Sequence, residues 1–90
     1  MSLPFDQIRI SKDSFIRKFS SQIECDELYW HKDKCNRVIK VISGEGWMYQ
    51  EENAIPVEIF PGSTFSIKNG TWHRVIRGSS DLSVLIKETI

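Results

Sequence analysis

The residue types best suited to chemistry in this 90-residue sequence are its two histidines and one nearby aspartate. A single residue separates His31 from Asp33, so in an extended chain both side chains leave the same side. Together with His73 they supply two imidazoles and one carboxylate. This is the ligand set of a facial triad, which leaves open positions on a metal for water or substrate. The set suits Fe(II), and Mn, Zn or Ni are also reasonable ions.

The same three residues also allow a purely structural interpretation. His31 could lie exposed near a loop with Asp33 in solvent, and His73 could fill the core with one hydrogen bond. Spacing alone does not choose between the two interpretations, because a His-x-Asp match is short and common. No catalytic residue is assigned beyond the candidate metal ligands His31, Asp33 and His73.

The hydrophobic pattern around these residues repeats every two positions, and no stretch keeps the spacing of a long amphipathic helix. We expect an all-β sandwich, barrel or jelly roll. The predicted strands cover residues 15–19, 28–31, 38–42, 46–50, 57–60, 64–67, 72–76 and 82–86. Turn residues at 44–46, 51–53, 61–62, 69–70 and 78–80 are expected to close hairpins. Residues 1–14 form an N-terminal arm, with either an edge strand at 7–10 or a helical turn at 11–13.

Alternation along the strands predicts which side chains share a face. Arg37 lies on the same face as Ile39 and Val41. If His73 points inward, Val75 and Arg77 point inward as well.

Charge argues against two classes of partner. There are 12 Lys and Arg residues and 12 Asp and Glu residues, and no basic block. The long-range field that draws proteins to phosphate backbones or anionic lipids is therefore missing, and we expect neither nucleic acid nor membrane as a partner. No run approaches the roughly 18 apolar residues of a membrane span, and residues 1–12 lack the apolar centre of a signal peptide. We expect a cytoplasmic protein.

Length predicts a single domain over residues 1–90. A chain of this size buries only about 60–65% of the surface that its unfolded form exposes, so we also expect a homodimer. Cys25 and Cys35 are expected to be free thiols, and Cys35 stays open as a soft metal ligand.

Residues 27–88 resemble a small single-domain cupin. The first cupin motif corresponds to His31-Lys32-Asp33, then Arg37, then the Val-Ile-Ser-Gly-Glu-Gly run at 41–46. The second corresponds to residues 60–75, from the Pro61-Gly62 turn to His73. The resemblance implies a double-stranded β-helix of jelly-roll type. Within the cupins, residues 60–75 and 82–88 look most like the mannose-6-phosphate isomerase type II branch.

The first motif departs from the family pattern at two positions. Cupins with a full metal site present three histidines and one glutamate, whereas this chain has Asp33 at the second histidine position and Arg37 at the glutamate position. His31 and His73 match the first and last ligands. Because a guanidinium stays protonated, Arg37 would repel a divalent ion. It could instead pair with Asp33, turn outward, or bind an anionic group of a substrate.

The expected ligand is a small, anionic, sugar-like molecule. Arg37, Arg77, Trp47 and Tyr49 are the candidate ligand-binding residues, since cations hold anions and aromatic rings can stack on a sugar. The aromatic residues could equally be core packing.

Three functions remain open. The first is a metal-dependent cupin with isomerase-like chemistry. Its general base could be Glu27, Glu45, Glu88 or a metal-bound hydroxide, although no motif assigns one of them to this role. The second is chemistry like that of the Fe(II) dioxygenases on the same triad. The third is a metal-free ligand-binding or structural cupin in which Arg37 pairs with Asp33.

Overall fold

The computed structural model describes residues 5–24 and 28–89, which contain strands and no helix. The strands are β1 (Asp6–Arg9), β2 (Ser14–Phe19), β3 (Asn36–Ser43), β4 (Met48–Glu51), β5 (Val57–Glu58), β6 (Thr64–Ile67), β7 (His73–Ile76) and β8 (Leu82–Thr89). They form a five-stranded sheet in the order β1-β2-β8-β3-β6 and a three-stranded sheet in the order β5-β4-β7. All pairs of neighbouring strands are antiparallel. The predicted all-β jelly-roll class is confirmed.

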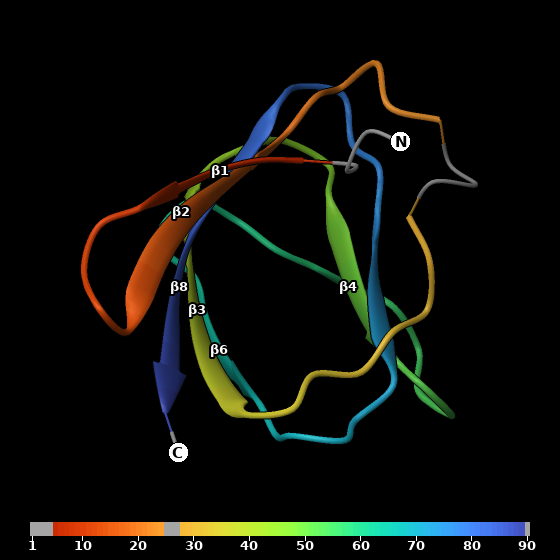
Figure 1. Ribbon diagram of the computed structural model, residues 1–90. Helices are drawn as coiled ribbons and strands as arrows, with labels where there is room; N and C mark the ends of the chain where they lie inside the picture. Colours follow the sequence, from red (N-terminus) through yellow and green to blue (C-terminus); the bar gives the residue numbers. More distant parts are fainter. Residues whose placement is uncertain (1–4, 25–27, 90) are drawn as a thin grey trace.

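The two sheets face each other and enclose the core, with the larger sheet on one side and β4 and β7 on the other (Figure 1). Alternation explains which residues meet there. Ile39 and Val41 of β3 stand opposite Ile86 and Val84 of β8, and all four are buried. Phe15 of β2 stands opposite Ile86 from the other side. These cross-strand rows of apolar side chains give the larger sheet one apolar face, which must be covered by the smaller sheet.

Most of the predicted hairpins are wrong, although the turns themselves lie where they were expected. Only the turn at 51–53 joins strands that pair with each other, β4 and β5. The turns at 44–46, 61–62, 69–70 and 78–80 each carry the chain from one sheet to the other. Turn residues report a chain reversal by their backbone preferences, but they do not report which strand the next segment will pair with.

Residues 28–31 were predicted as a strand, and this prediction is wrong. The segment makes a single β-bridge, between His31 and His73. At the N-terminal end, the edge strand proposed for 7–10 is present as β1, so a helical turn at 11–13 is excluded. β1 and β2 form a second hairpin, which the sequence did not predict.

Gly78 lies where the chain leaves β7 and passes against the start of β4. A Cβ atom at this position would lie 2.1 Å from the Glu45 carbonyl oxygen and 2.5 Å from the Trp47 ring. Since both neighbours belong to backbone or core, we expect Gly78→Ala to lower the free energy of unfolding by about 2 kcal/mol. Urea unfolding measures this. Gly62→Ala is the comparison: Gly62 has a φ of +90° but open space around it, so only the backbone penalty of about 1 kcal/mol applies. Equal stability of Gly78→Ala and wild type would contradict this packing.

Apolar side chains form a row across the outer face of the larger sheet. Ile8 stands opposite Ile16, which stands opposite Leu85, and Ile8 is 69% exposed. Such a row offers surface to another subunit, but the homodimer stays a prediction. Within the described ranges no helix is long and apolar enough to cross a membrane.

Candidate metal centre

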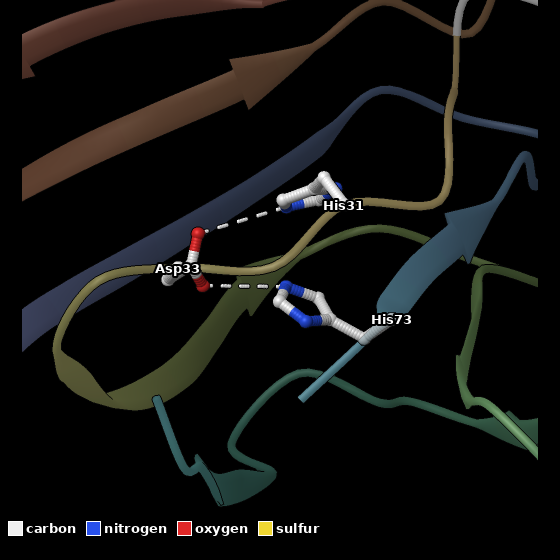
Figure 2. Close-up of side chains that lie close together, drawn as sticks. All are labelled: His31, Asp33 and His73. Atoms are coloured by element: carbon white, nitrogen blue, oxygen red, sulfur yellow. Dashed lines mark ion pairs between the residues drawn. The ribbon is translucent and has the colours of Figure 1, made fainter. Parts of the chain in front are cut away.

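The three candidate metal ligands come together in the structure (Figure 2). One nitrogen or oxygen atom from each of His31, Asp33 and His73 lies within 4.8 Å of the other two. The His73 Nε2 atom is 3.4 Å from Asp33 Oδ2, and His31 Nε2 is 3.9 Å from Asp33 Oδ1. Ligand atoms that share an ion at about 2.1 Å lie roughly 3 Å apart, so only a small rotation is needed. The His31 side chain, 48% exposed, has room for it.

Backbone hydrogen bonds bring the two halves of this cluster together. His31 and His73 exchange both backbone bonds, at 3.0 and 2.8 Å. The Gly70 amide donates to the Asp33 carbonyl at 2.9 Å. The segment before β3 is therefore fixed to the loop between β6 and β7, and residues 40 positions apart share one site.

Both imidazole rings are oriented by carbonyl groups. His73 Nδ1 lies 2.8 Å from the Thr71 carbonyl oxygen, and His31 Nδ1 lies 3.1 Å from the Tyr29 carbonyl oxygen. Because a carbonyl oxygen only accepts, each Nδ1 must carry the proton. In the neutral ring, Nε2 then presents a lone pair, and both Nε2 atoms face the Asp33 carboxylate.

Burial of the ring favours this neutral form at His73. Burial lowers the pKa of His73 below its usual value, against the hydrogen bond to Thr71 that raises it. The Asp33 side chain is only 8% exposed, and its Oδ2 atom has no hydrogen-bond partner among the described residues. With both rings neutral, lone pairs from the three residues converge, an arrangement that a cation satisfies. The donor set fits a divalent ion.

Arg37 points into the site rather than outward. Its Nη1 atom is 3.1 Å from Asp33 Oδ1. On its other side Nη2 and Nε donate to Glu88 Oε2 at 2.8 and 3.1 Å, because Arg37 stands directly opposite Glu88 on β8. The Arg37–Asp33 pair is thus present, and Glu88 offsets part of the guanidinium charge next to the candidate ligands.

Glu88 should make the free energy of unfolding depend on pH in the acidic range. Its hydrogen bonds from Arg37, and then from Cys35, lower its pKa below 4.5. A carboxylate with a lowered pKa stabilises the fold above its unfolded pKa, and this contribution is lost as the pH falls from about 4.5 towards the folded value. We expect Glu88→Gln to lower the free energy of unfolding by about 0.5–1 kcal/mol at pH 7, since the pair is partly open to solvent, and by less at pH 3. Urea unfolding from pH 7 to 3 measures this, with the exposed Glu58→Gln as control. If Glu88→Gln lost the same free energy of unfolding at pH 7 and at pH 3, this prediction would be contradicted.

A cavity of about 330 Å³ lies between the sheets and reaches the cluster. His31, Asp33 and His73 line it together with apolar side chains from both sheets, among them Ile39 of the larger sheet and Val75 of the smaller one. A ligand in this cavity would lie against the candidate metal ligands.

The predicted ligand-binding residues separate into two groups. Arg37 and Tyr49 line the cavity, and the Tyr49 hydroxyl donates to Glu51 at 2.9 Å; burial raises the pKa of Tyr49. Trp47 does not line it: the side chain is fully buried in the core and its indole donates to the Ser80 carbonyl at 2.6 Å. Arg77 does not line it either, because β7 ends at Ile76 and the alternation ends with it.

Arg77 instead donates to the Ile23 carbonyl oxygen at 2.7 Å. The residue that sequence reasoning missed is Arg17. It lies on β2 between the buried Phe15 and Phe19, so it shares their inward face and lines the cavity. A charged residue within an alternating apolar stripe was the signal that could have identified it.

The remaining candidates lie outside the cluster. The Cys35 thiol is free and donates to Glu88 at 3.2 Å, and burial raises its pKa. Glu88 itself is bound to Arg37, and Glu45 is exposed in the turn before β4. Cys25 and Glu27 lie outside the described residues.

Comparison with known proteins identifies the fold. No protein-family model matches the sequence, and no curated protein matches it significantly. Several solved structures do match this chain. DMSP lyase DddQ from Ruegeria pomeroyi DSS-3 aligns with a TM-score of 0.81 at 12% identity, over 97% of this chain and 47% of the lyase. A cupin domain from Bordetella pertussis Tohama I aligns with a TM-score of 0.65 at 12% identity, over 100% of this chain and 99% of that one.

A proposed mannose-6-phosphate isomerase from Ralstonia eutropha JMP134 aligns with a TM-score of 0.64 at 18% identity, over 93% of this chain and 81% of that one. The chain spans only 37% and 47% of the length of the two DMSP lyase structures that it matches. Identities this low concern the fold and not the activity. Two facing antiparallel sheets and a series of cupin neighbours together show that this chain has the fold of a small cupin.

Proposed function

We propose that the barrel binds a divalent metal ion through His31, Asp33 and His73 and presents it to a small anionic ligand in the adjoining cavity. The observation that carries this proposal is the convergence of two oriented imidazole nitrogens on a buried carboxylate whose Oδ2 atom lacks a hydrogen-bond partner among the described residues. A bound divalent ion would polarise a carbonyl or enediol oxygen of the ligand.

The chain's own residues would support that chemistry in three ways. The Thr71 and Tyr29 carbonyls hold the imidazoles in one tautomer. The apolar cavity wall excludes water from the ligand, which strengthens electrostatic interactions within the site. Arg37 holds the Asp33 carboxylate in place through the 3.1 Å contact.

The same contact supports a second candidate, a metal-free binding cupin. If Arg37 occupies the place of the ion, the Arg37–Asp33 pair completes the site electrostatically and the cavity binds a ligand without metal. In that case the two imidazoles would serve as hydrogen-bond partners for the ligand.

The reaction class is a separate proposal. We propose isomerase-like chemistry on an anionic, sugar-like ligand as the first candidate, supported by the residues at 60–75 and 82–88 and by a structural neighbour proposed to be a mannose-6-phosphate isomerase. Dioxygenase-like chemistry with Fe(II) is the alternative that the His31, Asp33 and His73 set supports. The fold itself hosts several chemistries, since the neighbours also include DMSP lyases.

Metal analysis of protein purified without an affinity tag tests the proposal. We expect close to one equivalent of bound metal per chain, or one equivalent taken up by the chelated protein in a calorimetric titration with Mn, Fe(II), Zn or Ni. If metal is taken up, oxygen consumption with Fe(II) separates dioxygenase-like from isomerase-like chemistry. No uptake of any of the four ions would overturn the metal proposal and leave the metal-free candidate.

A further inference from the structure

Arg17 is an ionisable residue in the wall of the barrel that the candidate metal centre does not use. On β2 the side chains of Phe15 and Phe19 point into the core, and Arg17 lies between them on the same face. Its side chain lines the same cavity as His31 and Asp33. A cation facing inward in a small β-barrel requires a partner, because burial removes its hydration.

Within the part of the chain that the structure describes, the direct contacts of the Arg17 guanidinium are with neutral groups. Its Nε atom donates to the Gln7 side chain at 3.0 Å, and its guanidinium lies 3.9 Å above the Phe5 ring. Among residues 5–24 and 28–89, no carboxylate oxygen lies within ion-pair distance of it, whereas Arg37 has both Asp33 and Glu88. Among these described residues, the two terminal nitrogens of Arg17 donate no hydrogen bond.

The electrostatic surroundings add to this imbalance. Burial, and next the positive charge of Arg37, lower the pKa of Arg17 to about 10; the more distant negative charges of Asp33 and Glu88 act in the opposite direction and offset only part of this. The group is still protonated at neutral pH. A negative charge placed beside Arg17 would relieve both effects at once, since it would replace lost hydration and offset the repulsion from Arg37.

We propose that Arg17 binds the carboxylate of a short ligand with a largely apolar body, and that this ligand occupies the barrel cavity. The inference deepens the proposed function, on which it rests for the identity of the cavity as the ligand site. It keeps the small anionic ligand of the proposed function but replaces the sugar-like body with an apolar one, so that the ligand is a carboxylic acid. It also places the anion on a residue other than Arg37 or Arg77.

The geometry favours a carboxylate on an apolar body for two reasons. The free edge of the guanidinium is a planar pair of nitrogens, which matches the two oxygens of a carboxylate. The rest of the cavity wall is mostly apolar, with side chains such as Leu82, Val84 and Phe65. Ring hydroxyls of a sugar would lose their hydrogen bonds to water against such a wall, whereas methylene groups gain from burial.

Hexanoate and its neutral amide hexanamide are the probes that test this proposal. Both are titrated calorimetrically into the full chain after removal of metal with a chelator, so that Arg17 is tested without the metal centre. We expect hexanoate to bind at least 10-fold more tightly than hexanamide, because a hydrogen bond to a charged group contributes more than one to a neutral group. Mannose 6-phosphate is the polar anion for comparison.

Two variants of neighbouring residues test whether Arg17 is responsible for the tighter binding of hexanoate. Arg17→Gln should weaken hexanoate binding about 10-fold and leave hexanamide binding unchanged. Lys18→Gln removes the same charge from the exposed face of the same strand and should change neither affinity. Thermal unfolding without probe shows whether Arg17→Gln is folded; if it is not, Arg17→Lys replaces it, and we expect weaker hexanoate binding because the planar pair of donors is lost.

The possible outcomes separate this inference from the proposed function. Equal affinity of wild type for hexanoate and hexanamide, no binding of either, or equal loss in Arg17→Gln and Lys18→Gln would overturn the inference. Preference for mannose 6-phosphate without an effect of Arg17 would also overturn it, yet would leave the anionic ligand of the proposed function in place. Failure of the chain to take up metal, with hexanoate still bound through Arg17, would overturn the metal proposal alone.

Discussion

Asp33→Ala is expected to remove metal binding, with a loss of affinity of more than 100-fold. Asp33 provides the negative charge of the candidate centre and lies between the two imidazoles, 3.4 Å from His73 Nε2 and 3.9 Å from His31 Nε2. Loss of a residue that merely supports a metal ligand costs about 10–100-fold, and loss of a charged ligand should exceed that. Calorimetric titration of the chelated protein with Mn or Zn measures the affinity.

A matched control distinguishes loss of a ligand from loss of charge in general. Glu58→Ala removes a carboxylate from the exposed strand β5 and should leave metal affinity unchanged. His73→Ala should reproduce most of the loss caused by Asp33→Ala, because both belong to the buried part of the cluster. Asp33→Ala must also be shown to be folded, since Arg37 loses one of its two partners in this variant. Metal bound equally well by folded Asp33→Ala and wild type would contradict the centre.

Arg37→Glu is expected to have the second largest effect, in the opposite direction. Arg37 Nη1 lies 3.1 Å from Asp33, so its charge stands directly beside the position of the ion. Two unit charges at ~4 Å interact with about 4 kcal/mol at an effective dielectric of 20, although Glu88 offsets part of this repulsion. A glutamate would remove the repulsion and add a carboxylate to the shell. We expect metal binding to tighten by about 10- to 100-fold.

The new glutamate would stand opposite Glu88 across two strands, and like charges in that position repel each other. The substitution is therefore best made together with Glu88→Gln and compared with Glu88→Gln alone. Arg37→Gln, tested in the same Glu88→Gln protein, separates removal of the positive charge from gain of a ligand. Unchanged affinity in both double variants would mean that the guanidinium does not oppose the ion, which favours metal-free binding through the Arg37–Asp33 pair.

The fold class could be predicted from sequence because its signals are local. A period of two along β2, β3 and β8 marks half-buried strands, and glycine-containing turns mark the points where the chain reverses. The same signals did not predict which strands pair with each other. Whether β3 continues to β4 within one sheet or crosses to the other depends on which apolar faces cover each other, and this is a property of the whole chain.

The candidate metal ligands were also accessible from sequence. Spacing placed His31 and Asp33 on one side, and His73, the other histidine of the sequence, completed the set of ligand types. The resemblance to the cupin motifs then matched His31 and His73 to the first and last ligands. The segment that carries His31 is nonetheless not a strand, and a single bridge to His73 holds it. The ligand types were evident from the sequence, whereas backbone pairing between distant segments brings the three side chains together.

Which other candidate side chains line the cavity could be seen only in the tertiary structure. Trp47 and Tyr49 are two positions apart and share a face, yet only Tyr49 reaches the cavity, since Trp47 packs against Phe19 and bonds to the Ser80 carbonyl. Arg77 lies just beyond the end of β7 and binds the Ile23 carbonyl instead. Arg17, on a strand far from both motifs, faces the cavity because β2 pairs with β8.

The all-β class, the inward set of apolar side chains and the types of the three candidate ligands follow directly from the order of the residues. Those properties follow from side-chain alternation and residue chemistry, which act over a few neighbouring positions. Two relations became visible only in the folded chain: Arg37 pairs with Asp33 and Glu88, and Arg17 faces the same cavity without a carboxylate partner in the described part of the chain. These relations depend on strand register and on the closure of two sheets, and no local pattern encodes them.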